Sequence, residues 1–103
     1  MICLYFAEVL TYGVTNPIKV GVSTNPYRRM KELRNIDVYF PTLLGFFPFG
    51  DRALAHRIEA IVCARFPRCP RYGKKSNEVL AASFEEIIAF VTPLVGDRPF
   101  VKA

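Results

Sequence analysis

The sequence predicts a small domain of the α/β class (α+β), built from three strands and about three helices. Three observations support this: apolar, β-branched runs separated by turn formers, apolar side chains recurring every three or four residues, and a capping residue before each helical segment. With 103 residues, of which 51% are hydrophobic, the chain can bury one core. We therefore expect a single domain over residues 1–95 and a loosely held C-terminal tail over residues 96–103.

The first part of the chain predicts two strands followed by a helix. Residues 1–10 and 18–22 are apolar runs rich in β-branched and aromatic side chains, and residues 11–17 between them are dense in turn formers. This pattern predicts two strands joined by a long hairpin. Asn25 can then cap a helix, and Pro26 supplies the preset φ of a first helical position, so we expect a helix to begin here.

A third strand and a second helix follow. Residues 42–47 resume the β pattern, and Pro41 indicates an edge position or an irregular start. Asp51 can cap a helix whose apolar positions recur at three- and four-residue spacing and which Pro67 ends. Glu59 lies about 100° from the centre of that apolar stripe. We therefore expect its side chain on the flank of the helix, half covered.

The last part of the chain predicts one more helix. Residues 68–77 form a basic loop, after which residues 78–80 could add a short extended piece. The segment Ser83-Phe84-Glu85-Glu86 matches a capping box, in which serine and glutamate satisfy the first backbone N–H groups of a helix. We expect this helix to end near Pro93.

The charge of the chain suits a polyanionic partner. The formal net charge is +5 and the isoelectric point is about 9.4. The basic residues fall into two groups: Arg28, Arg29, Lys31 and Arg34, then Arg65, Arg68, Arg71, Lys74 and Lys75. A basic protein with no nucleic-acid role stays open as an alternative.

The cysteines and the apolar first segment exclude several other classes. Three cysteines without a secretory segment argue against a disulfide framework, so a reducing cytoplasm is expected. The apolar opening run is interrupted by Glu8 and is too short to span a bilayer, so no membrane association is expected. His56, Cys63 and Cys69 lack a C-x-x-C pair and a fourth ligand, so structural zinc is not expected.

The polar residues left by this elimination suit phosphodiester chemistry. One histidine gives no persuasive Ser-His-Asp set, and the glycines form no known phosphate-cradling loop. Phosphodiester hydrolysis needs a ligand for a hard cation, a positive group beside the phosphate, and a group that orients or deprotonates water. The residues that remain for these tasks are Tyr5, Lys19, Arg28, Arg29, Glu59 and Asn77.

Five short motifs occur in a fixed order between about Leu4 and Ile88. They are Cys3-Leu4-Tyr5, Lys19-Val20-Gly21, the segment 25–33 with its paired arginines, Glu59-x-x-x-Cys63-x-x-Phe66, and Asn77-Glu78-Val79-Leu80. In order and spacing they resemble the GIY-YIG nuclease superfamily, within it a small phage and prophage branch with a Lys-Ile-Gly-type second motif. Two departures favour a noncatalytic member: the first motif keeps only its tyrosine, and Lys19 replaces the second tyrosine.

The resemblance implies a three-stranded antiparallel sheet with flanking helices, and cleavage of nucleic acid that depends on a divalent metal, Mg²⁺ or Mn²⁺. By motif position, Tyr5 would help to activate water, Arg29 would stabilise the phosphate and Glu59 would hold the metal ion. Lys19 is expected to assist at the phosphate, and Asn77 to lie near the metal. The residues expected to contact the nucleic-acid backbone are Arg28, Arg68, Arg71, Lys74 and Lys75.

Each of these assignments has an ordinary structural alternative. Tyr5 could be a strand residue with a buried ring and a wet hydroxyl, and Lys19 could point from its strand to a solvated face. Glu59 could pair with a basic neighbour at the surface, where such a pair contributes little. Arg28 and Arg29 are about 100° apart on a helix, so only one can face the sheet, and Arg29 is preferred.

The sequence thus supports two hypotheses. The first is a cytoplasmic, metal-dependent endonuclease acting on DNA, whose specificity would come from a homodimer, a protein partner or the substrate's shape, because the chain has no room for a separate recognition domain. The second is a noncatalytic nucleic-acid-binding or protein-interaction module, for instance a phage-type accessory protein or inhibitor.

Overall fold

The structure, a computed structural model, describes residues 1–9, 17–36, 41–69 and 79–103. Within these ranges the chain forms five strands and three helices. In chain order they are β1 (Ile2–Val9), β2 (Ile18–Ser23), α1 (Pro26–Ile36), β3 (Pro41–Phe49), α2 (Arg52–Arg65), β4 (Val79–Leu80), α3 (Phe84–Val95) and β5 (Val101–Lys102). Among the described residues, no helix is both long and apolar enough to cross a bilayer.

The strands form one antiparallel sheet in the order β4-β2-β1-β3-β5. The central strand β1 pairs with β2 on one side and β3 on the other, so Tyr5 lies between Gly21 and Phe46. The α+β class is confirmed, but the expected count of three strands is too low, because β4 and β5 add two-residue pairings at the edges. A strand of two residues is too short to show an alternation of apolar and polar side chains, so it is recognised only by its pairing with a neighbouring strand.

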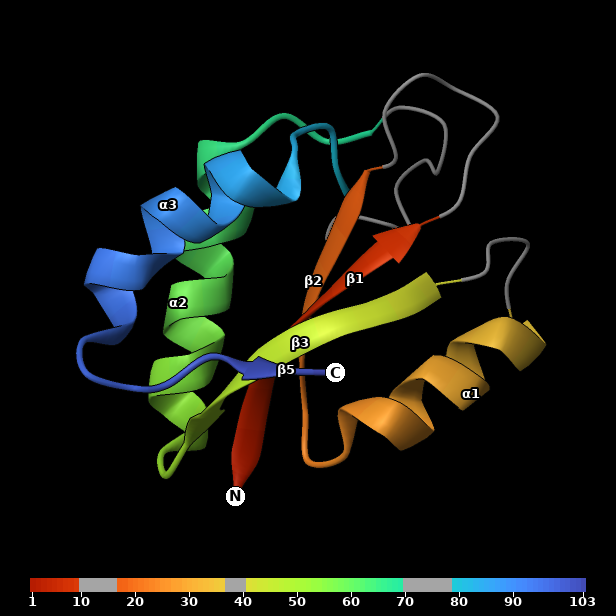
Figure 1. The fold of residues 1–103 in the computed structure, drawn as a ribbon, viewed down its shortest axis with the longest axis horizontal. Helices are drawn as coiled ribbons and strands as arrows, with labels where there is room; N and C mark the ends of the chain where they lie inside the picture. The colour runs from red at the N-terminus through yellow and green to blue at the C-terminus, as the bar shows by residue number, and fades with distance from the viewer. Residues whose placement is uncertain (10–16, 37–40, 70–78) are drawn as a thin grey trace.

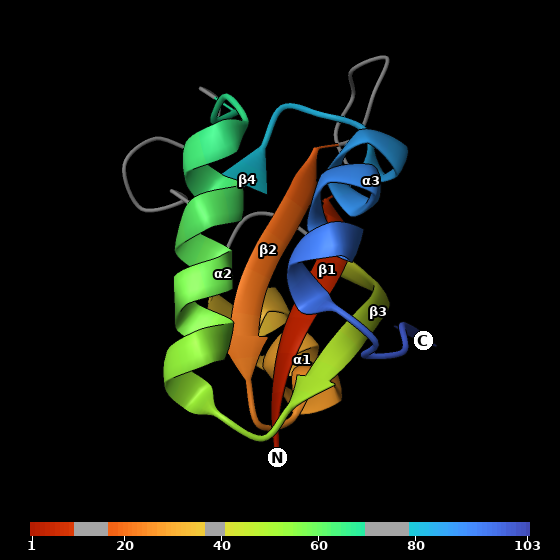
Figure 2. The same cartoon turned by 90° about the vertical axis from the view of Figure 1, so that its left-hand side faces the viewer.

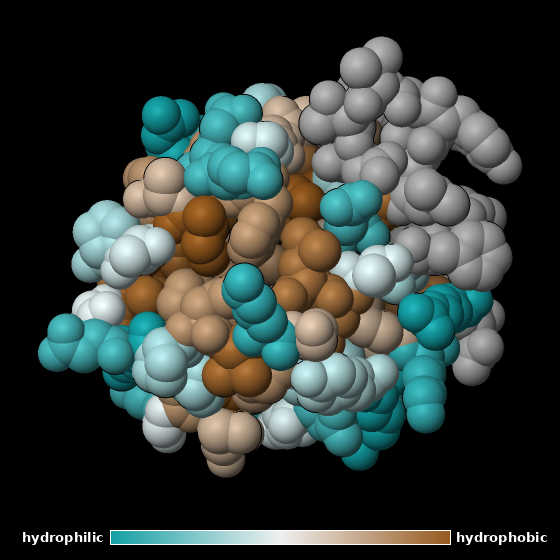
Figure 3. All heavy atoms as spheres, in the orientation of Figure 1, coloured by the Kyte–Doolittle hydropathy of each residue, from teal (hydrophilic) through white to brown (hydrophobic). Residues whose placement is uncertain are grey.

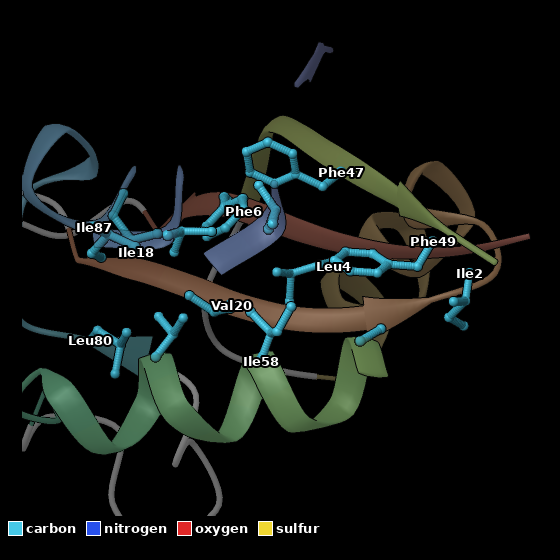
Figure 4. Close-up of a cluster of buried hydrophobic side chains, with 14 residues drawn as sticks. Ile2, Leu4, Phe6, Ile18, Val20, Phe47, Phe49, Ile58, Leu80 and Ile87 are labelled. Carbon is cyan, nitrogen blue, oxygen red and sulfur yellow. The ribbon is translucent and has the colours of Figure 1, made fainter. Parts of the chain in front are cut away.

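Helices cover both faces of this sheet. Helices α2 and α3 pack together on one face, and α1 lies on the other (Figures 1 and 2). Because side chains alternate along a strand, each face receives every second residue of β1 and β2. The main core, on the α2/α3 face (Figure 4), consists of Ile2, Leu4, Phe6, Ile18, Val20, Phe47, Phe49, Ala55, Ile58, Val62, Leu80, Ile87, Val91 and Val95. The smaller α1 core consists of Cys3, Tyr5, Ala7, Met30, Leu33 and Phe46.

The expected helix caps are present. The Asn25 side chain accepts a hydrogen bond of 3.1 Å from the backbone N–H three residues later, and the Asp51 side chain accepts one of 2.9 Å from the N–H two residues later. The Ser83 hydroxyl accepts from the backbone N–H of Glu86 at 3.2 Å and donates to the Glu86 carboxylate at 3.1 Å. Each cap satisfies a backbone donor that the helix itself leaves unpaired.

Helix α3 runs slightly beyond its expected end. Pro93 lies inside the helix, which continues to Val95. Proline removes one backbone donor, but in the last turn this costs few hydrogen bonds, and the Thr92 hydroxyl donates to the Ile88 carbonyl at 2.7 Å. Gly96 follows with a φ of 65°, a positive value that glycine adopts without strain because it has no Cβ.

The segment after Gly96 packs against the sheet and is not the loosely held tail expected from the sequence. Strand β5 pairs with β3, and the Phe100 ring centroid lies 5.1–6.2 Å from those of Phe6, Phe47 and Phe84. Gly45 makes room for this ring, because a Cβ there would stand 2.3 Å from it. Apolar side chains accordingly gather over the region where α3, β3 and β5 meet (Figure 3). This contact depends on residues over fifty positions apart, which a local pattern does not reveal.

Candidate functional site

A tyrosine and an arginine meet on the α1 face of the sheet. Tyr5 lies in β1 within the α1 core, and its side chain is only 2% exposed. Arg29, in the second turn of α1, forms a side-chain hydrogen bond with Tyr5. Arginine has only donors, so the Tyr5 hydroxyl oxygen is the acceptor. The two residues expected to work together at a phosphate are therefore in contact.

Gly21 makes this contact possible. It is the cross-strand partner of Tyr5, and the tyrosine ring lies across it. A Cβ at this position would stand 2.4 Å from both the hydroxyl oxygen and the Cζ atom of Tyr5, closer than real Cβ contacts allow. The glycine of the second sequence motif thus has a steric role, since any side chain there would displace the ring.

The Arg29 guanidinium is held as a stable cation. Partial burial lowers its pKa, but the hydrogen bonds and charges of Glu32 and Tyr5 outweigh this effect and raise the pKa above the ordinary value. Glu32 contacts Arg29 at 3.2 Å and Arg28 at 3.5 Å. Glu32 is not among the residues predicted for the site, although its spacing of three and four residues from the two arginines is the pattern that predicts such pairs.

Lys19 lies on the same face as Tyr5 and Gly21. It pairs with Ala7 of β1 and, as expected, points away from the main core. The alternative of a solvated side chain is wrong, because Lys19 is only 6% exposed. The α1 layer covers this face, so a residue that alternates away from one core enters another buried environment. A buried lysine usually has a partner or a function.

Glu59 belongs to the opposite layer. It lies on α2, whose buried residues enter the main core, and its side chain is 15% exposed, so it is covered more completely than the half expected for a flank position. Its carboxylate lies 3.4 Å from Nδ1 of His56, three residues earlier on the same helix. Helical phase separates Glu59 by about 120° from Arg65, which stacks on Phe90 of α3.

The remaining predicted residues are less informative. Arg28 and Arg68 are exposed. Asn77, Arg71, Lys74 and Lys75 lie outside the described residues. Across the described part of the chain, no group of three or more His, Cys, Asp or Glu side chains is placed to hold a metal ion. Burial raises the pKa of the Cys3 thiol, which the charged N-terminus only partly opposes, so Cys3 is a neutral core residue and no nucleophile.

The fold and the site define a small, basic α+β domain in which a buried tyrosine over a glycine contacts a partly exposed arginine. The family model of the T5orf172 domain matches residues 2–94, so the chain belongs to the T5orf172 domain family. No curated protein and no solved structure matches the chain.

This match corrects the family suggested by the motifs. The T5orf172 domain is a different family from the GIY-YIG nucleases, so the assignment to that superfamily was wrong. The two departures in the first and second motifs were the sequence signal that the assignment did not fit. The T5orf172 family is one of nuclease-like and DNA-binding domains, and membership supports a nucleic-acid-related function.

Proposed function

We propose that this protein is a metal-dependent endonuclease that hydrolyses phosphodiester bonds in DNA and acts in the cytoplasm. The observation that carries the proposal is the contact between the Tyr5 hydroxyl and the Arg29 guanidinium above Gly21. A phenol and a permanent cation side by side supply a group for proton transfer and a group for phosphate charge. Family membership supports a nucleic acid as the partner of this site.

Arg29 and Tyr5 would divide the work at the phosphate. The guanidinium carries donors in a planar fork that matches phosphate oxygens, so Arg29 would bind and neutralise the phosphate whose bond is cleaved. The Tyr5 oxygen accepts from Arg29, and its own proton can then be exchanged with a water molecule near the phosphate. Lys19, on the same face, would add positive charge beneath the phosphate.

The donor chemistry of Glu59 suits a magnesium or manganese ion. Mg²⁺ prefers oxygen ligands, keeps several waters and is commonly held by one or two carboxylates together with substrate phosphates. Glu59 provides one such carboxylate, and His56 fixes its orientation from 3.4 Å away. When bound, the ion would lower the pKa of a coordinated water. Asn77 is proposed as a further polar residue near it.

DNA binding would rest on backbone contacts. Arg28 and Arg68 are exposed cations, and we propose Arg71, Lys74 and Lys75 of the basic loop as further contacts. Contacts of this kind are largely indifferent to sequence, and they weaken steeply with salt. Specificity is then proposed to come from a homodimer or a protein partner.

A nicking assay tests the proposal. Supercoiled plasmid is incubated with the protein and Mg²⁺ or Mn²⁺, and the variants Arg29→Ala, Glu59→Ala and Tyr5→Phe are compared with the natural chain. We expect each to lose about a hundredfold or more of the rate, as for the loss of other charge-stabilising groups. The matched controls are Arg57→Ala on the exposed side of α2 and Glu85→Ala on α3, which should keep full activity. Equal activity in all five variants would refute the assignment.

The burial of Tyr5 and Lys19 favours a second candidate, a noncatalytic DNA-binding module. Tyr5 is 2% exposed and Lys19 is 6% exposed, so a substrate reaches them only if neighbouring groups move. On this reading the pair stabilises the α1 face, and the surface arginines do the binding. The module would retain DNA at low salt and release it at high salt, with no nicking under any metal. The same assay combined with salt-dependent retention on DNA separates the two candidates.

A further inference from the structure

A large aromatic side chain stands exposed beside the candidate site. Tyr27, in the first turn of α1, is 53% exposed, although most of its neighbours on the sheet side of this helix are buried. Its ring packs edge-on against Phe46, with the ring centroids 6.2 Å apart and the planes at 85°. This contact holds the Tyr27 ring in a fixed orientation while leaving more than half of the side chain uncovered.

The sheet continues this apolar surface. Phe46 pairs with Tyr5 of β1 on one side and with Val101 of β5 on the other. Directly paired residues of neighbouring strands point to the same face of a sheet, so Val101, 38% exposed, extends the surface beyond Phe46. We call the exposed Tyr27 and Val101, together with the buried Phe46 between them, the aromatic shelf. It begins one strand away from Tyr5.

Two cations of α1 lie beside the shelf. Arg28 follows Tyr27 directly, and Arg34 lies on the same flank of α1, where its guanidinium donates to the Pro41 carbonyl at the start of β3. Tyr27 and Arg29 are about 160° apart around the helix, so the shelf and the Tyr5–Arg29 contact lie on opposite flanks of α1. An occupant of the shelf therefore meets an apolar ring flanked by cations, which fits a ligand that joins a flat aromatic group to phosphates.

We propose that Tyr27 stacks an unpaired nucleobase, and that the substrate class is DNA with a single-stranded stretch or an unpaired base. This inference rests on the nucleic-acid function proposed above. Exposed aromatic rings beside basic grooves bind successive bases by stacking, and any base can serve because each has a flat face. In a duplex those faces are covered by neighbouring base pairs, so a shelf of this kind discriminates in favour of unpaired DNA.

Binding measured without cleavage tests this inference. A fluorescently labelled single strand and the matching duplex are titrated in EDTA with the full chain and with Tyr27→Ala, Tyr27→Phe and Ile61→Ala. Ile61 is a matched control, because it is an exposed apolar residue on α2. We expect Tyr27→Ala to weaken single-strand binding about tenfold, as for other base-stacking residues, and duplex binding by less than about twofold. Tyr27→Phe and Ile61→Ala should bind like the natural chain.

A second readout reports stacking directly. A single strand carrying 2-aminopurine should lose fluorescence on binding the natural chain and keep it on binding Tyr27→Ala at saturating protein. If Tyr27→Ala weakened binding to the single strand and to the duplex equally, Tyr27 would contact the DNA backbone and the inference would be overturned. Unchanged single-strand binding by Tyr27→Ala would also overturn it, and is the result expected if a protein covers the shelf. Failure of every variant to bind either DNA would also overturn it. If the protein showed no metal-dependent cleavage but still bound DNA, this would contradict the proposed endonuclease activity and not the stacking of a base on Tyr27.

Discussion

The two faces of the sheet differ in what they bury. The α2/α3 face is filled by aliphatic and aromatic side chains, with Phe6 fully buried among three other rings. The α1 face has a much smaller core, and it holds Tyr5 and Lys19, two side chains with polar ends. One face therefore supplies most of the stability, which leaves the other free to hold groups that are costly to bury. The predictions below test this division, starting from the largest expected effect.

Removing an aromatic ring from the main core should cost most. Phe6→Ala takes away a ring that contacts those of Phe47, Phe84 and Phe100. We expect the free energy of unfolding to fall by about 3–5 kcal/mol, measured by urea denaturation followed by circular dichroism. The matched change on the other face, Met30→Ala, should cost less, because the α1 core surrounding it is smaller. A larger loss for Met30→Ala would reverse the proposed division.

Filling the space above Gly21 should damage the α1 face selectively. In Gly21→Ala the new Cβ collides with Tyr5, so the ring must shift, which disturbs its contact with Arg29. We expect a loss of about 1–3 kcal/mol in unfolding free energy, together with loss of any nicking activity. Gly50→Ala is the control, because no atom lies within 4 Å of the added Cβ. If Gly21→Ala behaved like Gly50→Ala, the close contact with Tyr5 would not exist in solution.

Removing the cap of α2 should have a moderate effect. Asp51→Ala leaves the backbone N–H of Ala53 without its side-chain acceptor, and caps of this kind contribute about 1 kcal/mol. We expect the thermal midpoint to fall by a few degrees, measured by calorimetry. Asp51→Asn keeps an accepting oxygen and should retain most of the stability. Equal losses in both variants would assign the effect to charge and not to the cap.

Neutralising Glu32 should have the smallest effect, and it should strengthen DNA binding. Glu32 now pairs with both Arg28 and Arg29, so it competes with phosphate for their donors. An exposed ion pair of this kind contributes at most about 1 kcal/mol, so we expect Glu32→Gln to lower the dissociation constant by about two- to fivefold. Fluorescence anisotropy measures the change. Glu85→Gln on α3 alters the net charge equally, and an identical gain there would indicate a general charge effect.

Much of the local structure was predictable from the sequence. The helix caps at Asn25, Asp51 and Ser83 each have a donor within three residues, so their partners can be read from adjacent positions. The flank position of Glu59 followed from helical phase alone. The residues of the site were less predictable, because their environments depend on distant segments. Strand alternation shows that Lys19 leaves the main core, but it does not reveal that the side chain is buried on the other face as well.

The sequence by itself determined the α+β class, the caps, the three longer strands and the basic charge, since each follows from interactions among near neighbours in the chain. Only the tertiary structure decided that β4 and β5 complete the sheet, that Phe100 fills the space above Gly45, and that Tyr5 meets Arg29 while Glu59 belongs to the opposite layer. The physical reason is that a strand pattern specifies which residues share a face, but the element that covers each face is chosen by packing between distant segments.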